Sequence, residues 1–355
     1  MTSLARQTMD LAIARLPARL MPEGAAASLG QAAGHLAPDV PLYFEYRLAG
    51  ADHSIDVSQH LFAGDGGAEA LRSLAERSLK AGGGAGADAW RRLAALADAW
   101  SSDAVLAGGI VEIGLEHDQA PDGDWSRPPA VFAAFRGDIL DDRAAGEQFM
   151  ATVAPGSLAA WRALISAVEC AGSHGLVPGR MVGAMLSRDG QLRCMVRGLG
   201  PPATRKFLTA VGWPGDHDAL VDLLAQPPLA GEATRLVLGF GPELAGDCGI
   251  EVIESQDAGG RLRLNALLNW LVERDLADGE RVRALDVWPG AVTPLDATGD
   301  WPDALILRDL GAARAGFDYF NAFISHVKIN IARGRPLPAK AYLGFAPVRR
   351  RACTT

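Results

Sequence analysis

Residues 323–345 alternate between apolar and polar side chains, the period of a β-strand with one buried face. Two alternating runs, 323–331 and 339–345, flank a turn at 333–336 and therefore predict a β-hairpin. One face of this hairpin carries His326, Lys328, Asn330, Lys340 and Tyr342. The other face carries Val327, Ile329, Ile331, Ala341, Leu343 and Phe345. A cationic face is costly to bury unless it meets water or an anionic ligand, so the pattern predicts a sheet with a polar lumen.

The same hairpin design occurs four more times along the chain. The paired runs are 42–48 with 54–58, 110–117 with 130–135, 181–187 with 191–197, and 235–240 with 250–253. Helical periodicity lies before and between the hairpins, at 4–16, 68–80, 88–100, 157–170, 203–211, 216–225, 261–276 and 280–287. We interpret 289–303 as a loop, and 304–307 is an apolar segment without a clear assignment.

Two consecutive strands in each unit distinguish this chain from a parallel βαβ fold, in which one helix follows each strand. We therefore expect an α+β fold in which ten antiparallel strands close into a barrel with helices outside. Closure removes the exposed edges of the sheet. A barrel of this size is wider than its side chains alone can fill, so we expect a ligand cavity inside it. The apolar strand faces would pack outward on the helices.

The domain limits follow from the same pattern. We expect an N-terminal helical segment over 1–40, a single barrel domain over 41–348, and a basic tail over 349–355. With 355 residues and 49% hydrophobic content, the chain can bury a large core. We interpret the first helix as amphipathic rather than as a targeting peptide.

Charge and cysteine usage exclude several classes of protein. The net charge of −8 argues against a general nucleic-acid binder, which is normally basic. The four cysteines are far apart and lack metal-type spacing, as expected of reduced thiols in a cytoplasmic protein. No apolar run approaches the ~20 residues that span a bilayer, so we expect no membrane insertion. The sequence leaves the oligomeric state open.

Three short motifs carry a resemblance to a known family. They are the strand 111–116 with Glu112 and Glu116, the basic positions Arg193 and Arg197, and the Lys-x-Tyr sequence at 340–342. Together with the hairpin rhythm from about 41 to 346, they resemble the ABBA, or prenyltransferase-barrel, aromatic prenyltransferases of the dimethylallyltryptophan synthase group. The resemblance implies a barrel of repeated α-β-β-α units with the reaction inside it. It also implies a transferase of secondary metabolism that moves a prenyl group from an allylic diphosphate to an aromatic acceptor.

The chain also departs from that family. It has only four tyrosines, so a full tyrosine cage around a carbocation is not available. The run 130–135 lacks the basic residue expected opposite the strand with the glutamates. These differences indicate either a divergent member or a barrel with another use. The alternative function is a non-catalytic or differently catalytic barrel that binds a peptide or a small anionic ligand.

Four cations alternate with apolar residues on two separate hairpins: Arg193, Arg197, Lys328 and Lys340. Converging cations in a cavity of low dielectric could bind the diphosphate leaving group. The alternative is a solvated sheet face with cross-strand ion pairs. Because four basic groups can neutralise a diphosphate, no cofactor is required and Mg²⁺ is optional. Asp141 and Asp142 superficially resemble a diphosphate–Mg²⁺ motif, but their polar connection favours a helix cap.

Three glutamates are candidate acid–base groups. Glu112 and Glu116 share one strand face, and Glu45 lies with Tyr43 and Arg47 on a rival face of the first hairpin. The acceptor could be an indole, a phenol or an aromatic side chain of a peptide. A carboxylate beside it could accept the proton that it loses. Each glutamate could equally be a salt-bridged strand residue. The sequence does not identify the acceptor or the length of the prenyl chain.

Aromatic side chains could surround an allylic cation. We expect Tyr342 and Tyr43 to screen it through cation–π contacts. His326 could serve as a proton carrier or as a donor to diphosphate, although a lone strand histidine is more often structural. Four tryptophans occur at helical core spacing and are expected to pack in the core: Trp90, Trp100, Trp161 and Trp270.

Overall fold

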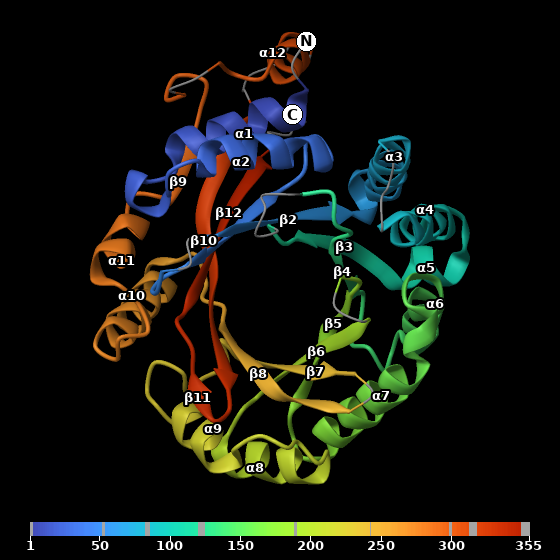
Figure 1. The fold of residues 1–355 in the computed structure, drawn as a ribbon, viewed down its shortest axis with the longest axis vertical. Coiled ribbons are helices and arrows are strands. Elements are labelled where there is room, and N and C mark those ends of the chain that lie inside the picture. Colours follow the sequence, from blue (N-terminus) through green and yellow to red (C-terminus); the bar gives the residue numbers. More distant parts are fainter. Residues whose placement is uncertain are drawn as a thin grey trace, which may run out of the picture.

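The computed structural model describes residues 3–51, 54–81, 86–119, 125–187, 190–241, 243–297, 300–311 and 318–348. These residues form a closed antiparallel β-barrel surrounded by helices (Figure 1). The sequence prediction of a barrel with helices outside is confirmed. The basic tail expected at 349–355 lies outside the described residues. The domain boundary expected at residue 40 stays a prediction.

Ten strands close the barrel. They are β1 (Leu42–Arg47), β2 (Ile55–Phe62), β3 (Ile110–His117), β4 (Ala130–Phe135), β5 (Val177–Met185), β6 (Gln191–Arg197), β7 (Thr234–Phe240), β8 (Leu244–Val252), β10 (Tyr319–Ala332) and β12 (Lys340–Val348). Each strand from β1 to β8 pairs with the next, and β12 lies between β1 and β10. The long strand β10 also pairs with β8, which closes the circuit. Two short strands, β9 (Gly290–Val292) and β11 (Arg335–Pro336), pair with β10.

The helices form the outer layer (Figure 1). They are α1 (Leu4–Arg15), α2 (Ala25–Ala32), α3 (Gly67–Lys80), α4 (Ala87–Ser102), α5 (Ala104–Gly109), α6 (Arg143–Val153), α7 (Leu158–Ser173), α8 (Pro201–Ala210), α9 (His217–Leu224), α10 (Ala258–Val272), α11 (Gly279–Leu285) and α12 (Asp303–Gly311). Within the described part of the chain, no helix has the length and apolar character needed to cross a membrane.

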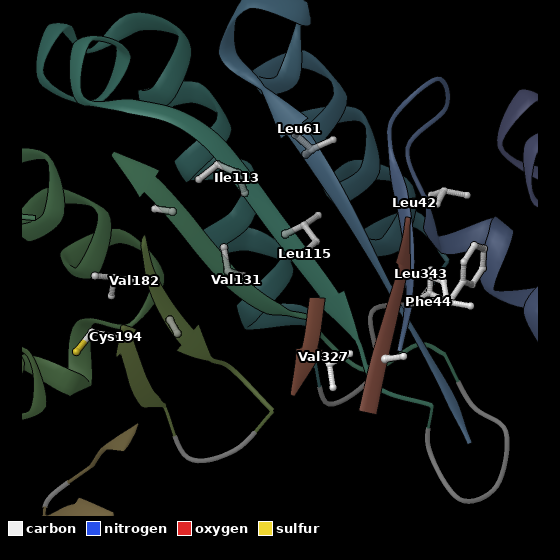
Figure 2. Close-up of a cluster of buried hydrophobic side chains, with 14 of the residues drawn as sticks. Leu42, Phe44, Leu61, Ile113, Leu115, Val131, Val182, Cys194, Val327 and Leu343 are labelled. Carbon is white, nitrogen blue, oxygen red and sulfur yellow. The ribbon is translucent and has the colours of Figure 1, made fainter. Parts of the chain in front are cut away.

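The core lies between the strands and the helices. Val196, Val327 and Leu343 point away from the lumen and are almost fully buried, as their alternation predicts. Figure 2 shows Val327 and Leu343 within a cluster of buried apolar side chains contributed by several strands. Burying one such side chain stabilises the fold by roughly 1.5–3 kcal/mol. The interface between strands and helices therefore supplies much of the driving force for closure.

The four tryptophans expected in the core are all buried. Trp100 shows how such a residue connects the layers, because its Nε1 donates to the carbonyl of Ile110 at 3.1 Å, joining α4 to the first residue of β3. Helix α9 begins as predicted, since the Asp216 carboxylate accepts from the Ala219 N–H at 3.0 Å.

Several elements differ from the sequence prediction. Strand β2 continues to Phe62, beyond the expected end at 58, and 289–303 contains the short strand β9. The unassigned segment 304–307 belongs to α12. Helix α2 escaped prediction because its alanine- and glycine-rich sequence shows little apolar periodicity, and α5 and α6 were also missed. Asp142 precedes α6, but its carboxylate accepts from the Gly137 N–H at 2.7 Å instead of capping the helix.

Candidate active site in the barrel lumen

Two adjoining cavities inside the barrel contain most of the predicted site residues. The central cavity, with a volume of about 200 Å³, includes Tyr43, Ser58, His60, Glu116, Phe132, Met181, Arg193, Met195, Arg235, Val237, Glu251, His326, Lys328 and Tyr342 in its lining. The polar chamber, with a volume of about 240 Å³, is lined by Glu45, Arg47, Asp56, Glu116, Asp118, Gln119, Arg193, Lys328, Asn330, Lys340 and Tyr342. Four residues line both: Glu116, Arg193, Lys328 and Tyr342. Closure of the barrel thus brings residues distant in sequence into one site.

Glu45 is the centre of a charge network in the polar chamber. Its carboxylate accepts from the Lys340 ammonium and from the Tyr342 hydroxyl. Burial alone would raise the pKa of Glu45, but Lys340 and Tyr342 outweigh burial and lower it to about 2. Glu45 is therefore a stable carboxylate whose charge is already neutralised by its neighbours.

Lys328 has its own carboxylate partner on the adjacent strand. Its Nζ lies 2.9 Å from Oε1 of Glu251, in a pair whose two side chains are only 11% and 12% exposed. Burial would raise the pKa of Glu251, but the attraction of Lys328 outweighs it and lowers that pKa to about 2. The charges of both lysines in the predicted diphosphate site are thus neutralised by glutamates of the barrel.

Arg47 and Asp56 form a third pair, with 3.1 Å between Nη2 and the carboxylate. Burial, together with repulsion from Glu45, nevertheless raises the pKa of Asp56 to about 7. The chamber therefore contains more carboxylate than its cations fully stabilise. Its charge state is expected to change near neutral pH.

Arg193 and Arg235 differ from the other lumen cations. Both line the central cavity, and neither forms an ion pair or hydrogen bond with another residue in the described ranges. Burial lowers the pKa of Arg235, an effect that Glu251 partly opposes. Because guanidinium groups form bidentate contacts with phosphate oxygens, these two side chains are suited to an anionic ligand.

Arg197 does not line the lumen cavities with the other predicted cations. It is exposed at the end of β6 and lies opposite Arg235 on β7. It shares a strand face with Arg193, four residues away, or about 13 Å at the rise of an extended strand. The expected inward position thus holds for Arg193, Lys328 and Lys340, whereas Arg197 is at the barrel rim.

Glu116 is a lumen carboxyl without a bonding partner among the residues that the structure describes. Burial and repulsion from Glu45 and Asp118 raise its pKa, and Lys328 and Arg193 oppose them. It lies at the junction of the central cavity and the polar chamber. A ligand N–H or O–H could reach this carboxyl from the central cavity.

Glu112 lies four residues before Glu116, where β3 pairs with Phe62 of β2. Its carboxylate contacts Nδ1 of His60. The ring centroid of His60 lies 4.3 Å from that of Tyr43. Burial, followed by the charge of Glu112, raises the pKa of Tyr43 to about 12. Tyr43 is thus a neutral phenol in the cavity wall.

His326 and Tyr342 form a stacked pair on neighbouring strands, with ring centroids 3.9 Å apart and an interplanar angle of 17°. Nδ1 of His326 is 3.1 Å from the Ser325 hydroxyl. Burial lowers the pKa of His326 to about 4, so the imidazole is neutral near pH 7.

Part of the cavity wall is apolar. Phe132, Met181 and Met195 line the central cavity without any charge. Gly183 is required beneath Phe132, since a Cβ at that position would approach Cε1 of Phe132 to 2.5 Å. The cavity lining thus combines cationic and apolar side chains.

Several lining residues were missed by sequence reasoning. His60 was missed because strand β2 was expected to end at residue 58. Arg235 and Glu251 do alternate with the apolar Leu236 and Ile250, and this pattern could have placed them on the lumen face. The alternation could not reveal which cations would meet carboxylates, because pairing depends on how the barrel closes.

The part of the chain that the structure describes contains no cluster of three or more His, Cys, Asp or Glu side chains arranged to bind a metal ion. The acidic residues Asp141 and Asp142 lie at α6, outside the barrel.

Comparison with known proteins supports the architecture. No family model matches the sequence, and no curated protein is significantly similar to it. Among solved structures, a 6-dimethylallyl tryptophan synthase superposes with a TM-score of 0.54 at 14% identity, over 99% of both chains. The 6-dimethylallyltryptophan synthase from Micromonospora olivasterospora, in complex with DMASPP and Trp, gives a TM-score of 0.53 at 15% identity, over 97% of both chains. The chain therefore has the prenyltransferase-barrel, or ABBA, fold of these synthases.

Proposed function

We propose that the protein transfers a prenyl group from an allylic diphosphate to an aromatic acceptor inside the barrel. The observation that carries this proposal is the arrangement of the central cavity. Arg193 and Arg235, which have no carboxylate partner among the residues that the structure describes, lie in the same cavity as apolar side chains and a histidine–tyrosine stack. This combination suits a donor that is anionic at one end and hydrocarbon at the other.

In this proposal, Arg193 and Arg235 hold the diphosphate. Lys328 and Lys340 contribute less directly, because Glu251 and Glu45 already neutralise them. Arg197, at the rim, attracts the donor toward the lumen. Charge-assisted contacts with the leaving group stabilise the transition state as the carbon–oxygen bond breaks. Mg²⁺ remains optional, since the cations can neutralise the leaving group.

The prenyl chain would lie against the apolar wall, with its cationic carbon near the aromatic rings. Tyr342, Tyr43 and the neutral His326 present π faces that attract a carbocation. Exclusion of bulk water strengthens these interactions and limits hydrolysis of the donor. The acceptor would bind within reach of Glu116, whose carboxyl can accept a hydrogen bond from an indole N–H or a phenol O–H.

The other two glutamates have different environments. Glu45 is held by two donors with a pKa of about 2, so it is a poor proton acceptor. Glu112 is bound to His60. Tryptophan is the first acceptor to test, because one structural neighbour is described with Trp bound. A tryptophan-containing peptide and a phenol complete the panel.

The test is turnover with dimethylallyl and geranyl diphosphate against this panel, detected as prenylated product by mass spectrometry and as released diphosphate. We expect product with at least one pair of substrates, and loss of most of it in Arg193→Gln. Diphosphate binding without any product would contradict prenyl transfer. That result would instead support the alternative of a barrel that binds a small anionic ligand.

A further inference from the structure

The pair of His60 and Glu112 is arranged as a proton-accepting site. Glu112 contacts Nδ1 of His60 on one side of the ring. The opposite edge faces Gly114, where a Cβ would lie 3.9 Å from Cε1 and 4.0 Å from Nε2 of His60. His60 and Gly114 both line the central cavity, and Nε2 has no hydrogen-bond partner among the described residues.

The position of the carboxylate determines which nitrogen can accept a proton. A carboxylate at Nδ1 favours the tautomer with the proton on Nδ1, because that N–H can then donate to Glu112. Nε2 is left with a free lone pair at the cavity edge. Glu112 would also stabilise the imidazolium formed when Nε2 takes up a proton.

We propose that Nε2 of His60 accepts the proton that the aromatic acceptor loses after prenylation, with Glu112 as the positioning residue. This inference rests on the proposed function and assigns the proton to a residue outside the three candidate glutamates. The absence of a side chain at Gly114 leaves space beside the imidazole edge. Tyr43, packed against the His60 ring, restricts its orientation from the other neighbouring strand.

The allylic carbon–oxygen bond breaks and the diphosphate leaves with the bonding electron pair. The acceptor ring donates a π pair to the allylic cation, which forms a carbon–carbon bond and an arenium ion. The carbon–hydrogen bond at that position then returns its electron pair to the ring. The released proton binds Nε2 of His60 and later passes to solvent.

The test compares the full chain with His60→Gln and Glu112→Gln, and uses His174→Gln as a control, because His174 lies at the end of α7 outside the barrel. Dimethylallyl diphosphate is the donor, with ring-protonated or ring-deuterated tryptophan, or another acceptor from the panel that is turned over. Affinity for the thiodiphosphate analogue of the donor is measured by calorimetry. Thermal unfolding confirms that each variant folds.

We expect His60→Gln to lower the rate of product formation by ~10²–10⁴-fold, the usual range for general-base catalysis, with donor affinity within about twofold of the original. Glu112→Gln should lose a smaller factor. Loss of the base should make proton removal rate-limiting, so a primary deuterium isotope effect should appear in His60→Gln. His174→Gln should match the unmodified chain.

Four outcomes would overturn the inference. Full activity in both His60→Gln and Glu112→Gln would contradict it while leaving prenyl transfer intact. A rate loss in His60→Gln that parallels a loss of donor affinity, without an isotope effect, would assign a structural role to the pair. If His60→Gln does not fold, an unchanged rate of product formation in Glu112→Gln would contradict the role of the His60–Glu112 pair in proton acceptance. No turnover by the unmodified chain with any acceptor would contradict the proposed function, and this inference with it.

Discussion

The polar chamber and the central cavity use similar cations in different ways. In the chamber, Lys340 contacts Glu45 and Arg47 contacts Asp56, so both of these cations have a carboxylate within the barrel. Arg193, which lines both cavities, and Arg235, which lines the central cavity, have no such partner within the described residues. A cation with an internal counter-ion stabilises the fold only as part of its pair. A cation without one is available for an anionic ligand.

Lys328 stands at the boundary of the two regions. It lines both cavities but is bound to Glu251 at 2.9 Å. We therefore expect opposite effects from changes to neighbouring side chains. Changes to the paired groups should affect folding most, and changes to the unpaired arginines should affect ligand binding most.

The largest effect is expected where a buried pair is broken. Glu251→Gln leaves Lys328 almost fully buried without a counter-charge, whereas Glu45→Gln removes the counter-charge of Lys340, whose side chain is 22% exposed. Breaking a buried pair typically costs about 3–5 kcal/mol, so the free energy of unfolding should fall by that amount in Glu251→Gln and by less in Glu45→Gln. Urea denaturation measures the change, with the exposed Glu232→Gln as the matched control. Losses below about 1 kcal/mol would mean that these pairs do not hold the barrel together.

The unpaired arginines should show the reverse behaviour. Arg193→Gln and Arg235→Gln each remove a charged donor, and such contacts are worth roughly 1.5–3 kcal/mol. We expect weaker binding of inorganic diphosphate by that amount, measured calorimetrically, with little change in unfolding free energy. Unchanged affinity in both variants would return these arginines to the alternative of a solvated strand face.

The paired chamber should also respond to pH. The pKa of Asp56 is raised to about 7 by burial and by Glu45, against an ordinary value near 3.8. Between these values the folded state holds a proton that the unfolded state has lost. This contribution to stability is therefore complete below about pH 4 and is lost as pH rises through about 7, by up to ~1.4 kcal/mol per pH unit.

The Asp56→Asn variant isolates this contribution, because asparagine cannot titrate. Urea midpoints between pH 5 and pH 8 should fall more steeply with pH in the unmodified chain than in Asp56→Asn. Parallel curves would show that Asp56 does not titrate in this range. The depressed pKa values of Glu45 and Glu251 act in the opposite sense, since their stabilisation is lost as pH falls from about 4 toward 2.

The smallest effect is expected at the rim. Arg197 is exposed, so Arg197→Gln should weaken diphosphate binding by less than about 1 kcal/mol, because solvent and salt screen an exposed charge. Calorimetry at two salt concentrations measures the difference, which should shrink at higher salt. A loss as large as that of Arg193→Gln would place Arg197 in the binding site itself.

The hairpin periodicity was sufficient to predict the barrel and most of its lumen face. Lys328, Lys340 and Arg193 line the lumen because side chains alternate along each strand. Their counter-ions could not be predicted, since Glu251 and Lys328 are 77 residues apart and meet only when β10 closes the barrel against β8. His60 was not predicted as a lumen residue because the strand was expected to end at residue 58. Its contact with Glu112 was therefore not predicted either.

The most direct test of the account is a crystal structure of the protein with the unreactive thiodiphosphate analogue of dimethylallyl diphosphate and tryptophan. The account predicts diphosphate oxygens within hydrogen-bond distance of Arg193 and Arg235, and the prenyl chain against Phe132. It also predicts that the Lys340–Glu45 and Lys328–Glu251 pairs remain intact. Diphosphate bound outside the lumen, or bound by lysines that have left their carboxylates while both arginines stay free, would contradict it.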